Sequence, residues 1–177
     1  WVKNEVENCV KTKKSSNFAL AMAIMDLLNI NLSKIPADGM KLEMTLNGDF
    51  FTALDQETIK GGSVKVNLNI REHSGEVYTL KFVIQGEVIV ECDRCLDDLA
   101  LVVDAEETIK LTYNDESDST ADDIKFIPKN TNMYDASWDV YEIVELSLPI
   151  QRTHQVGECN EDMLSRICYE NDECLDE

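Results

Sequence analysis

Hydrophobic and polar residues alternate along several stretches of the chain, a pattern typical of strands that bury one face. Residues 40–46 and 64–70 both place apolar side chains at every second position. From Leu80 to Cys92 every second residue is again apolar or glycine. We therefore predict one long strand that carries the chain to Cys92 and is bulged or bent at Gly86.

The alternation resumes after the next turn, over residues 99–105, and residues 109–113 keep the same parity. The links between these stretches are short, which favours antiparallel neighbours. We predict an α+β fold, in which an antiparallel, meander-like sheet of about five strands carries two or three helices packed on one face.

Three segments have the pattern of helices. Residues 15–29 are apolar on more than one face, so this stretch needs a surface to dock on. Asp49 can cap a short helix anchored by two phenylalanines and stopped by Gly61-Gly62. A third helix begins at Asp135 or Ser137, before an apolar stripe that Pro149 ends. The phenylalanines are Phe50 and Phe51, and the stripe is Val140, Tyr141, Val144 and Leu148.

The charge of the chain narrows the range of partners. In 177 residues there are 35 acids and 16 bases, which gives a formal charge of −19. Sequence-independent binding to nucleic acid needs many lysines and arginines along one face. The charge therefore disfavours a protein of this nucleic-acid-binding class. A strongly acidic surface favours a basic partner instead.

The cysteines and the apolar runs indicate the compartment. Six cysteines are too few for a disulfide scaffold in a chain of this length. No apolar run approaches the roughly 20 residues of a membrane helix. We expect a protein of the reducing cytoplasm that has no contact with membranes.

The strongest chemical signal is Cys92-Asp93-Arg94-Cys95, which follows directly on the long predicted strand. Two thiols in such a turn supply half of a tetrahedral metal site. His154 and Cys159 form a second short-spaced pair of suitable donors. Together the four side chains predict a structural zinc site that joins the end of the sheet to the segment after the third helix.

Two other interpretations of these cysteines stay open. Reduced cysteines also fill space in structural turns, since cysteine is a common buried residue. A redox pair would need a low thiol pKa, which the acidic flanking residues disfavour. Cys168 and Cys174 could compete as metal ligands.

Little in the sequence indicates catalysis. The chain has two histidines, neither within a catalytic motif, and no glycine-rich phosphate loop. We predict a protein that acts by binding and is not an enzyme.

The run Gly86-x-Val88-x-Val90-x-Cys92-x-Arg94-Cys95 resembles the signature of the YceD family, the large ribosomal RNA subunit accumulation proteins. The segment Leu146-Ser147-Leu148-Pro149, followed by His154 and Cys159, is similar to that family's later block. The resemblance covers about residues 34–166. It divides the chain into an N-terminal extension (1–33, helical at 15–29), a YceD-like domain (34–166) and an acidic tail (167–177).

The resemblance implies a role in the accumulation of large-subunit (23S) ribosomal RNA, through ribosome assembly or RNA stability. Members of the family are commonly encoded beside a small basic protein of the large subunit. A basic large-subunit ribosomal protein, or a pre-ribosomal particle that contains it, is therefore the expected partner, and the acidic charge agrees with this.

The sequence leaves two other functions open, an RNA-binding module and a thiol oxidoreductase. A small metal-stabilised RNA-binding module would need Arg71, Lys81, Arg94 and Arg152 to form one basic patch. A thiol oxidoreductase would need an accessible, reactive Cys92.

Overall fold

The computed structural model describes residues 26, 28–73, 77–113 and 124–168, with side chains to residue 166. Its main feature is a five-stranded sheet in the order β2-β3-β4-β5-β6. The strands are β2 (Met40–Asn47), β3 (Ile59–His73), β4 (Val77–Glu91), β5 (Asp98–Tyr113) and β6 (Ile124–Ile127). Three α-helices, one short 3-10 helix and a second, two-stranded sheet accompany it in the described residues, which confirms the predicted α+β class.

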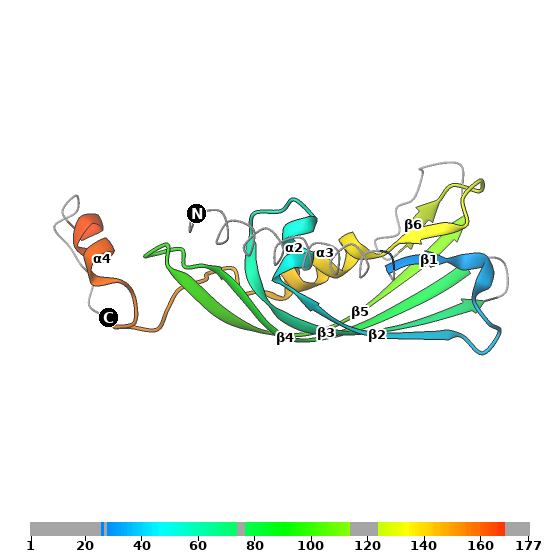
Figure 1. Cartoon of the computed structure of the whole chain (residues 1–177), viewed down its shortest axis with the longest axis horizontal. Helices are drawn as coiled ribbons and strands as arrows, with labels where there is room; N and C mark the ends of the chain where they lie inside the picture. Colours follow the sequence, from blue (N-terminus) through cyan, green and yellow to red (C-terminus); the bar gives the residue numbers. More distant parts are fainter. Residues whose placement is uncertain (1–25, 27, 74–76, 114–123, 169–177) are drawn as a thin grey trace, which may run out of the picture.

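The alternating stretches form the central strands and bury one face of the sheet, as predicted. β3 buries Val64, Val66, Leu68 and Ile70, and β4 buries Leu80, Phe82, Ile84, Val88 and Val90. Antiparallel pairing joins β2 to β5 in chain order. In Figure 1, β4 and β5 run as long, curved strands, and α2 and α3 lie on the same side of the sheet.

Gly86 lies within β4 at a point where two strands approach closely. Its φ is 154°, and a Cβ there would lie 2.3 Å from the carbonyl oxygen of Ser63. The ladder with β3 keeps its register through this residue, with Val64 opposite Gly86. The glycine therefore admits close backbone approach within one continuous strand.

Helix α2 (Gly48–Ala53) is shorter than predicted and starts differently. Its cap is Asn47, whose side-chain oxygen accepts from the Phe50 N–H at 3.4 Å. The predicted stop at Gly61-Gly62 is wrong, because both glycines lie inside β3 beside a register shift between Ile59 and Gly61. Phe50 and Phe51 are fully buried, as expected of core residues.

Helix α3 (Ser137–Ser147) lies where the third helix was predicted. Asp135 precedes it, and its carboxylate accepts from the Ser137 N–H at 2.9 Å. The predicted stripe is buried and faces the sheet. The chain then runs to a short helix, α4 (Glu161–Cys168), which Figure 1 places beyond the end of β4 and β5.

Several elements were not predicted. β1 (Asn29–Asn31) pairs with β7 (Met133–Asp135), and the short η1 helix (Leu32–Lys34) follows β1. β6 pairs with the last residues of β5 in the parallel direction, so the sheet is not a pure meander. Leu28, Ile30 and Leu32 belong to the same buried cluster as the sheet residues.

Some predictions fall outside the described residues. These are most of the helix at 15–29 and most of the tail at 167–177. The division of the chain at residues 33 and 166 stays a prediction.

Candidate metal centre

The end of β4 carries Cys92 and Cys95 into the interior. The parity of the strand directs Cys92 to the core face, where it is 0% exposed, and Cys95 is 1% exposed. Two hydrogen bonds of 2.9 Å close the turn, from the Leu96 N–H to the Cys92 carbonyl and from the Cys92 N–H to the Asp97 carbonyl. Leu96 has a φ of 63°, in the left-handed region, so the backbone stays strained to hold both thiols on one side.

The segment after α3 is tied to this turn by hydrogen bonds of both the backbone and side chains. The Asp93 N–H donates to the Arg152 carbonyl at 2.7 Å, and the Arg152 N–H donates to the Asp93 carboxylate at 2.7 Å. Asn160 donates to the Asp97 carboxylate at 3.1 Å. These contacts fix His154 and Cys159 against the cysteine turn. We call the 92–97 turn together with the 152–160 segment the cysteine corner.

Four donor atoms converge at the cysteine corner. The Cys92, Cys95 and Cys159 sulfurs and a His154 ring nitrogen all lie within 4.8 Å of one another. The Cys92 and Cys159 sulfurs are 4.0 Å apart, and His154 Nδ1 lies 3.4 Å from Cys95 Sγ and 4.0 Å from Cys159 Sγ. Zinc–sulfur and zinc–nitrogen bonds in a tetrahedron give ligand separations of roughly 3.6–3.8 Å. The cluster therefore fits a zinc ion with small adjustments of the side chains.

The orientation of His154 also suits a ligand. Its Nε2 lies 3.2 Å from the Asp98 carbonyl, an acceptor, so Nε2 carries the hydrogen and donates. Nδ1 then presents its lone pair to the three sulfurs. A backbone carbonyl that fixes the tautomer of a histidine is a usual feature of metal sites.

The surroundings of the thiols alter their acidity. Burial raises the pKa of the Cys92 thiol, but the backbone N–H groups of Cys95, Arg94 and His154 outweigh it and lower the pKa to about 6. Burial raises the pKa of Cys159. The hydrogen bond with Cys92 raises the pKa of His154. The expectation that acidic flanks would disfavour a Cys92 thiolate is therefore wrong, because hydrogen bonds from these N–H groups stabilise the thiolate.

Other chemistry fits this cluster less well. A disulfide needs sulfurs about 2.05 Å apart, and the Cys92, Cys95 and Cys159 thiols are free. A reactive redox thiol needs access from solvent, which the burial of Cys92 and Cys95 denies. Cys174 lies outside the described residues, and so does the side chain of Cys168. Four protein donors leave no open ligand position, which is the arrangement of a structural metal site.

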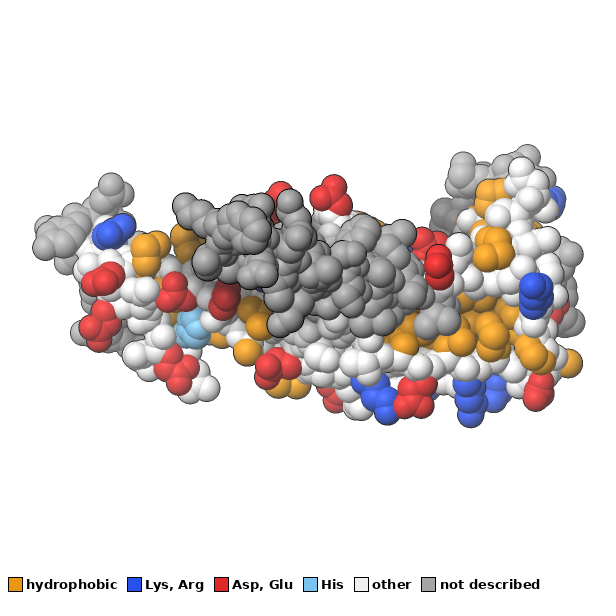
Figure 2. Space-filling model, in the orientation of Figure 1, with side chains coloured by type: hydrophobic (Ala, Val, Ile, Leu, Met, Phe, Trp, Pro, Cys, Tyr) orange, Lys and Arg blue, Asp and Glu red, His pale blue; other side chains and the backbone are white. Residues whose placement is uncertain are grey.

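The four basic residues predicted as a patch fall into two pairs. Arg71 on β3 lies opposite Thr79, close to Lys81 on β4. Arg94 and Arg152 both belong to the cysteine corner. Ten residues of strand separate Lys81 from the end of β4, roughly 33 Å at 3.3 Å per residue. Acidic side chains gather around the α4 end of the molecule (Figure 2).

A second polar cluster, between the sheet and α3, was not predicted. Asp139 is 3% exposed, and its carboxylate accepts from the Tyr134 hydroxyl at 2.6 Å and pairs with Lys125. Lys125 also pairs with Glu142 at 3.1 Å. An aspartate in the first turn of a helix is usually an exposed capping group, so the burial of Asp139 could not be predicted from its position in the sequence.

The sequence model of one family, described as large ribosomal RNA subunit accumulation protein YceD, matches residues 80–177. This match covers more than half of the 177 residues and includes both Cys/His pairs.

The chain belongs to the YceD family.

The match confirms the resemblance seen in the cysteine signature. The name of the YceD family implies a role in accumulation of the large ribosomal RNA subunit, and it describes an accumulation factor, not an enzyme. No curated protein and no solved structure matches the chain. Within the described residues, no helix combines the length and the apolar character needed to cross a bilayer.

Proposed function

We propose that this YceD protein is a non-catalytic factor of the cytoplasm that supports accumulation of 23S ribosomal RNA by binding a basic ribosomal protein or a pre-ribosomal particle. Cys92, Cys95, His154 and Cys159 hold one structural zinc ion in this proposal. The observation that supports it most is the convergence of two Cys/His pairs, remote in sequence, within a chain of the YceD family.

Zinc would hold the cysteine corner together. Three thiolates and one neutral imidazole would enclose the ion, and Arg94 in the same turn offsets part of the negative charge. Without the ion, the 152–160 segment is held to the sheet by a few hydrogen bonds at the surface. The metal would therefore fix the position of α4 and the segment before it.

The charge supports a protein partner. A chain with a formal charge of −19 attracts a basic ribosomal protein and repels bare phosphates. The basic residues considered for RNA contact form two separated pairs, and Lys81 is already paired with Glu106 at 2.5 Å. Direct RNA binding by one patch therefore has less support than protein binding.

Metal analysis of the reduced, untagged protein tests the zinc site. We expect about one equivalent of zinc in the native chain and almost none in Cys92→Ser or His154→Ala. His73→Ala removes the other histidine, which lies at the end of β3, and should keep the metal. Full zinc content in either ligand variant would refute this set of ligands, and Cys168→Ser then tests the competing thiol.

Affinity capture from cell lysate tests the partner. We expect the tagged chain to recover a basic large-subunit protein, and to keep it after ribonuclease treatment, because the contact is between proteins. Loss of the protein after ribonuclease would instead support the RNA-binding alternative. Recovery of neither a ribosomal protein nor large-subunit precursor RNA would refute the proposed function.

A further inference from the structure

One edge of the main sheet has no described strand beside it for most of its length. β6 pairs with β5 at Lys110–Tyr113, and within the described residues no strand neighbours the earlier part of β5 on that side. Open edges expose unpaired N–H and C=O groups, which can bind another extended chain.

Three contacts show which backbone groups of β5 face outward. The Asp97 carbonyl, just before β5, accepts from Cys92 on the β4 side. The Asp98 carbonyl faces His154, and the Thr108 N–H is satisfied by the Glu107 carboxylate at 3.0 Å. Backbone groups of a strand alternate with a period of two, so those of the even-numbered residues face away from β4. Among the described residues, none donates to or accepts from the outward groups of residues 100–106.

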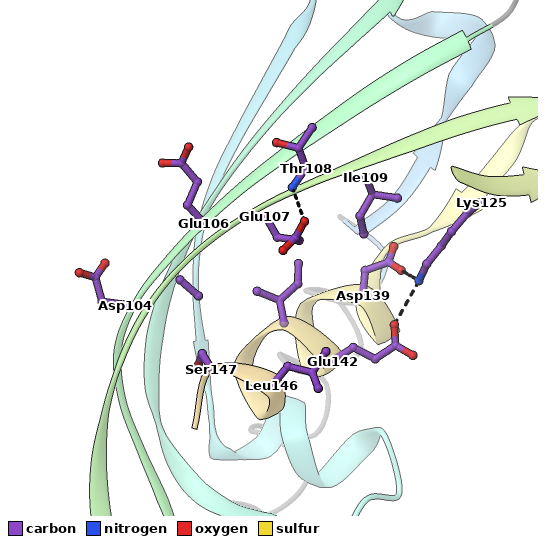
Figure 3. A pocket seen from close by; sticks show the side chains of 12 residues that line it. Asp104, Glu106, Glu107, Thr108, Ile109, Lys125, Asp139, Glu142, Leu146 and Ser147 are labelled. Atoms are coloured by element: carbon purple, nitrogen blue, oxygen red, sulfur yellow. Dashed lines mark hydrogen bonds and ion pairs between the residues drawn. The ribbon is translucent and has the colours of Figure 1, made fainter. Parts of the chain in front are cut away.

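A groove runs along this open edge. Residues 104–109 of β5 form one wall, α3 forms the other, and Lys125 of β6 lies at one end. Figure 3 shows the side chains of α3 opposite the β5 strand across this space. Its volume is about 640 Å³, within the range of pockets that hold ligands. We call it the β5–α3 groove.

The lining of the β5–α3 groove selects for a basic occupant. Its charged residues are five acids and one base. Lys125 pairs with two of these acids and Lys81 of β4 pairs with Glu106, so the lining keeps an excess of negative charge. The acids are Asp104, Glu106, Glu107, Asp139 and Glu142. Between them, Ala105, Ile109 and Ile143 give apolar surface, and Leu146 is 85% exposed at the rim.

We propose that an extended, basic segment of a partner protein adds to the open edge of β5 as a further strand and fills the β5–α3 groove. This inference rests on the proposed function, because it states how a basic ribosomal protein would be held. A second copy of this chain is a poorer occupant, because its own β5 edge would place acids opposite acids.

The geometry fixes the pattern of the added strand. Residues opposite Asp104 and Glu106 point their side chains to the same face of the sheet as these acids, so lysine or arginine suits them. The alternate residues point into the groove beside Ala105, Ile109 and Leu146, where apolar side chains fit. In an antiparallel arrangement, the basic residues are also those whose N–H groups face β5.

Fluorescence anisotropy with the full chain tests this proposal. The probe is a labelled eight-residue peptide of alternating lysine and valine, compared with two N-methylated forms. Methylation of the backbone nitrogens of the lysines, whose N–H groups face β5 in an antiparallel strand, should weaken binding at least tenfold. Methylation of the valine amides should change it by less than twofold. Equal affinity of all three peptides would show charge attraction alone and overturn the proposal.

Variants of the protein test the same edge from its own side. Thr108→Pro removes an outward N–H and should abolish peptide binding, whereas Thr108→Ala keeps the N–H and should bind normally. Proline is tolerated on an edge strand, and circular dichroism checks the fold. Glu107→Gln with Glu142→Gln should weaken binding several-fold, and Glu72→Gln, an exposed acid on β3, should not.

Two results would assign the edge differently. A dimer in sedimentation experiments that dissociates in Thr108→Pro would show that a second copy occupies the edge, and would overturn the proposal. No binding of any peptide would overturn it too. In that case, capture of a basic ribosomal protein from lysate would still support the proposed function, so the two failures are distinguishable.

Discussion

The cysteine corner and the β5–α3 groove lie at the two ends of the same open edge, yet they differ in what occupies their centres. At the corner, four donor atoms converge within 4.8 Å and leave no open ligand position. In the groove, about 640 Å³ of space is open between β5 and α3, with Glu107 and Glu142 on its two walls and Asp104 and Glu106 on the outer face of β5 (Figure 3). Converging donors indicate a structural role, whereas spaced charges around an open strand edge indicate recognition.

The comparison predicts that changes at the corner affect stability and that changes to the groove rim affect binding. One part of the groove is an exception, because Asp139 is buried there and needs its partners.

Removal of the metal should have the largest effect. A strong zinc chelator should lower the Tm by at least about 10 °C, because a structural zinc contributes several kcal/mol and each kcal/mol moves the Tm by about 2–4 °C in a chain of this size. Differential scanning calorimetry with and without chelator measures this shift. An unchanged Tm in protein shown to have lost its zinc would contradict a structural role.

The ion pair in the groove should have the next largest effect. Lys125→Met leaves the Asp139 carboxylate buried with the Tyr134 hydroxyl as its partner among the described residues. We expect a loss of about 2 kcal/mol, less than for a fully buried pair because Lys125 is half exposed. Urea denaturation measures the loss. The double variant Lys125→Met with Asp139→Asn should recover part of it, and equal losses in both variants would contradict this account.

Alkaline pH should weaken the same cluster. Burial and the hydrogen bond to Asp139 raise the pKa of Tyr134 far above its ordinary value. Burial lowers the pKa of Lys125, but hydrogen bonds to Asp139 and Glu142 outweigh it and raise the pKa. A group whose pKa is raised in the folded state contributes stability that is fully present below its pKa in the unfolded state. This stability is lost as the pH rises through the pKa of the folded state.

Stability should therefore begin to fall near pH 10, where an unfolded tyrosine ionises at its ordinary pKa of about 10. Urea midpoints between pH 8 and 11 measure the slope. Tyr134→Phe should cost about 1 kcal/mol at neutral pH by loss of its hydrogen bond, and it should flatten the alkaline slope. An unchanged slope in this variant would assign the alkaline loss to other groups.

The smallest effect on stability should come from the rim of the groove. Glu142 pairs with Lys125 at the surface, where ion pairs contribute little, so Glu142→Gln should change the free energy of unfolding by less than about 0.5 kcal/mol. Urea denaturation checks this value. A loss above about 1 kcal/mol would mean that the rim is part of the structure and would weaken the contrast with the corner.

The sequence predicted the central strands well because a buried face imposes a period of two on the residues themselves. The same parity placed Cys92 on the core face, and the spacing of Cys95 placed both thiols in one turn. The helix α3 was also predicted, from its apolar stripe and from Pro149 after it. Gly61-Gly62 was misread because glycine ends helices and also permits irregular strands, and the residues alone do not separate these uses.

The chain by itself therefore determined the alternating strands, the local Cys-x-x-Cys turn, the acidic charge and the family. Only the tertiary structure decided that His154 lies against Cys95, 59 residues away, and that β6 covers just the end of β5. Local patterns depend on neighbours a few residues apart, so they are visible in the sequence. Contacts between remote segments depend on the packing of the whole sheet. The donor types of the two Cys/His pairs suggested that they meet, but their geometry follows only from the fold.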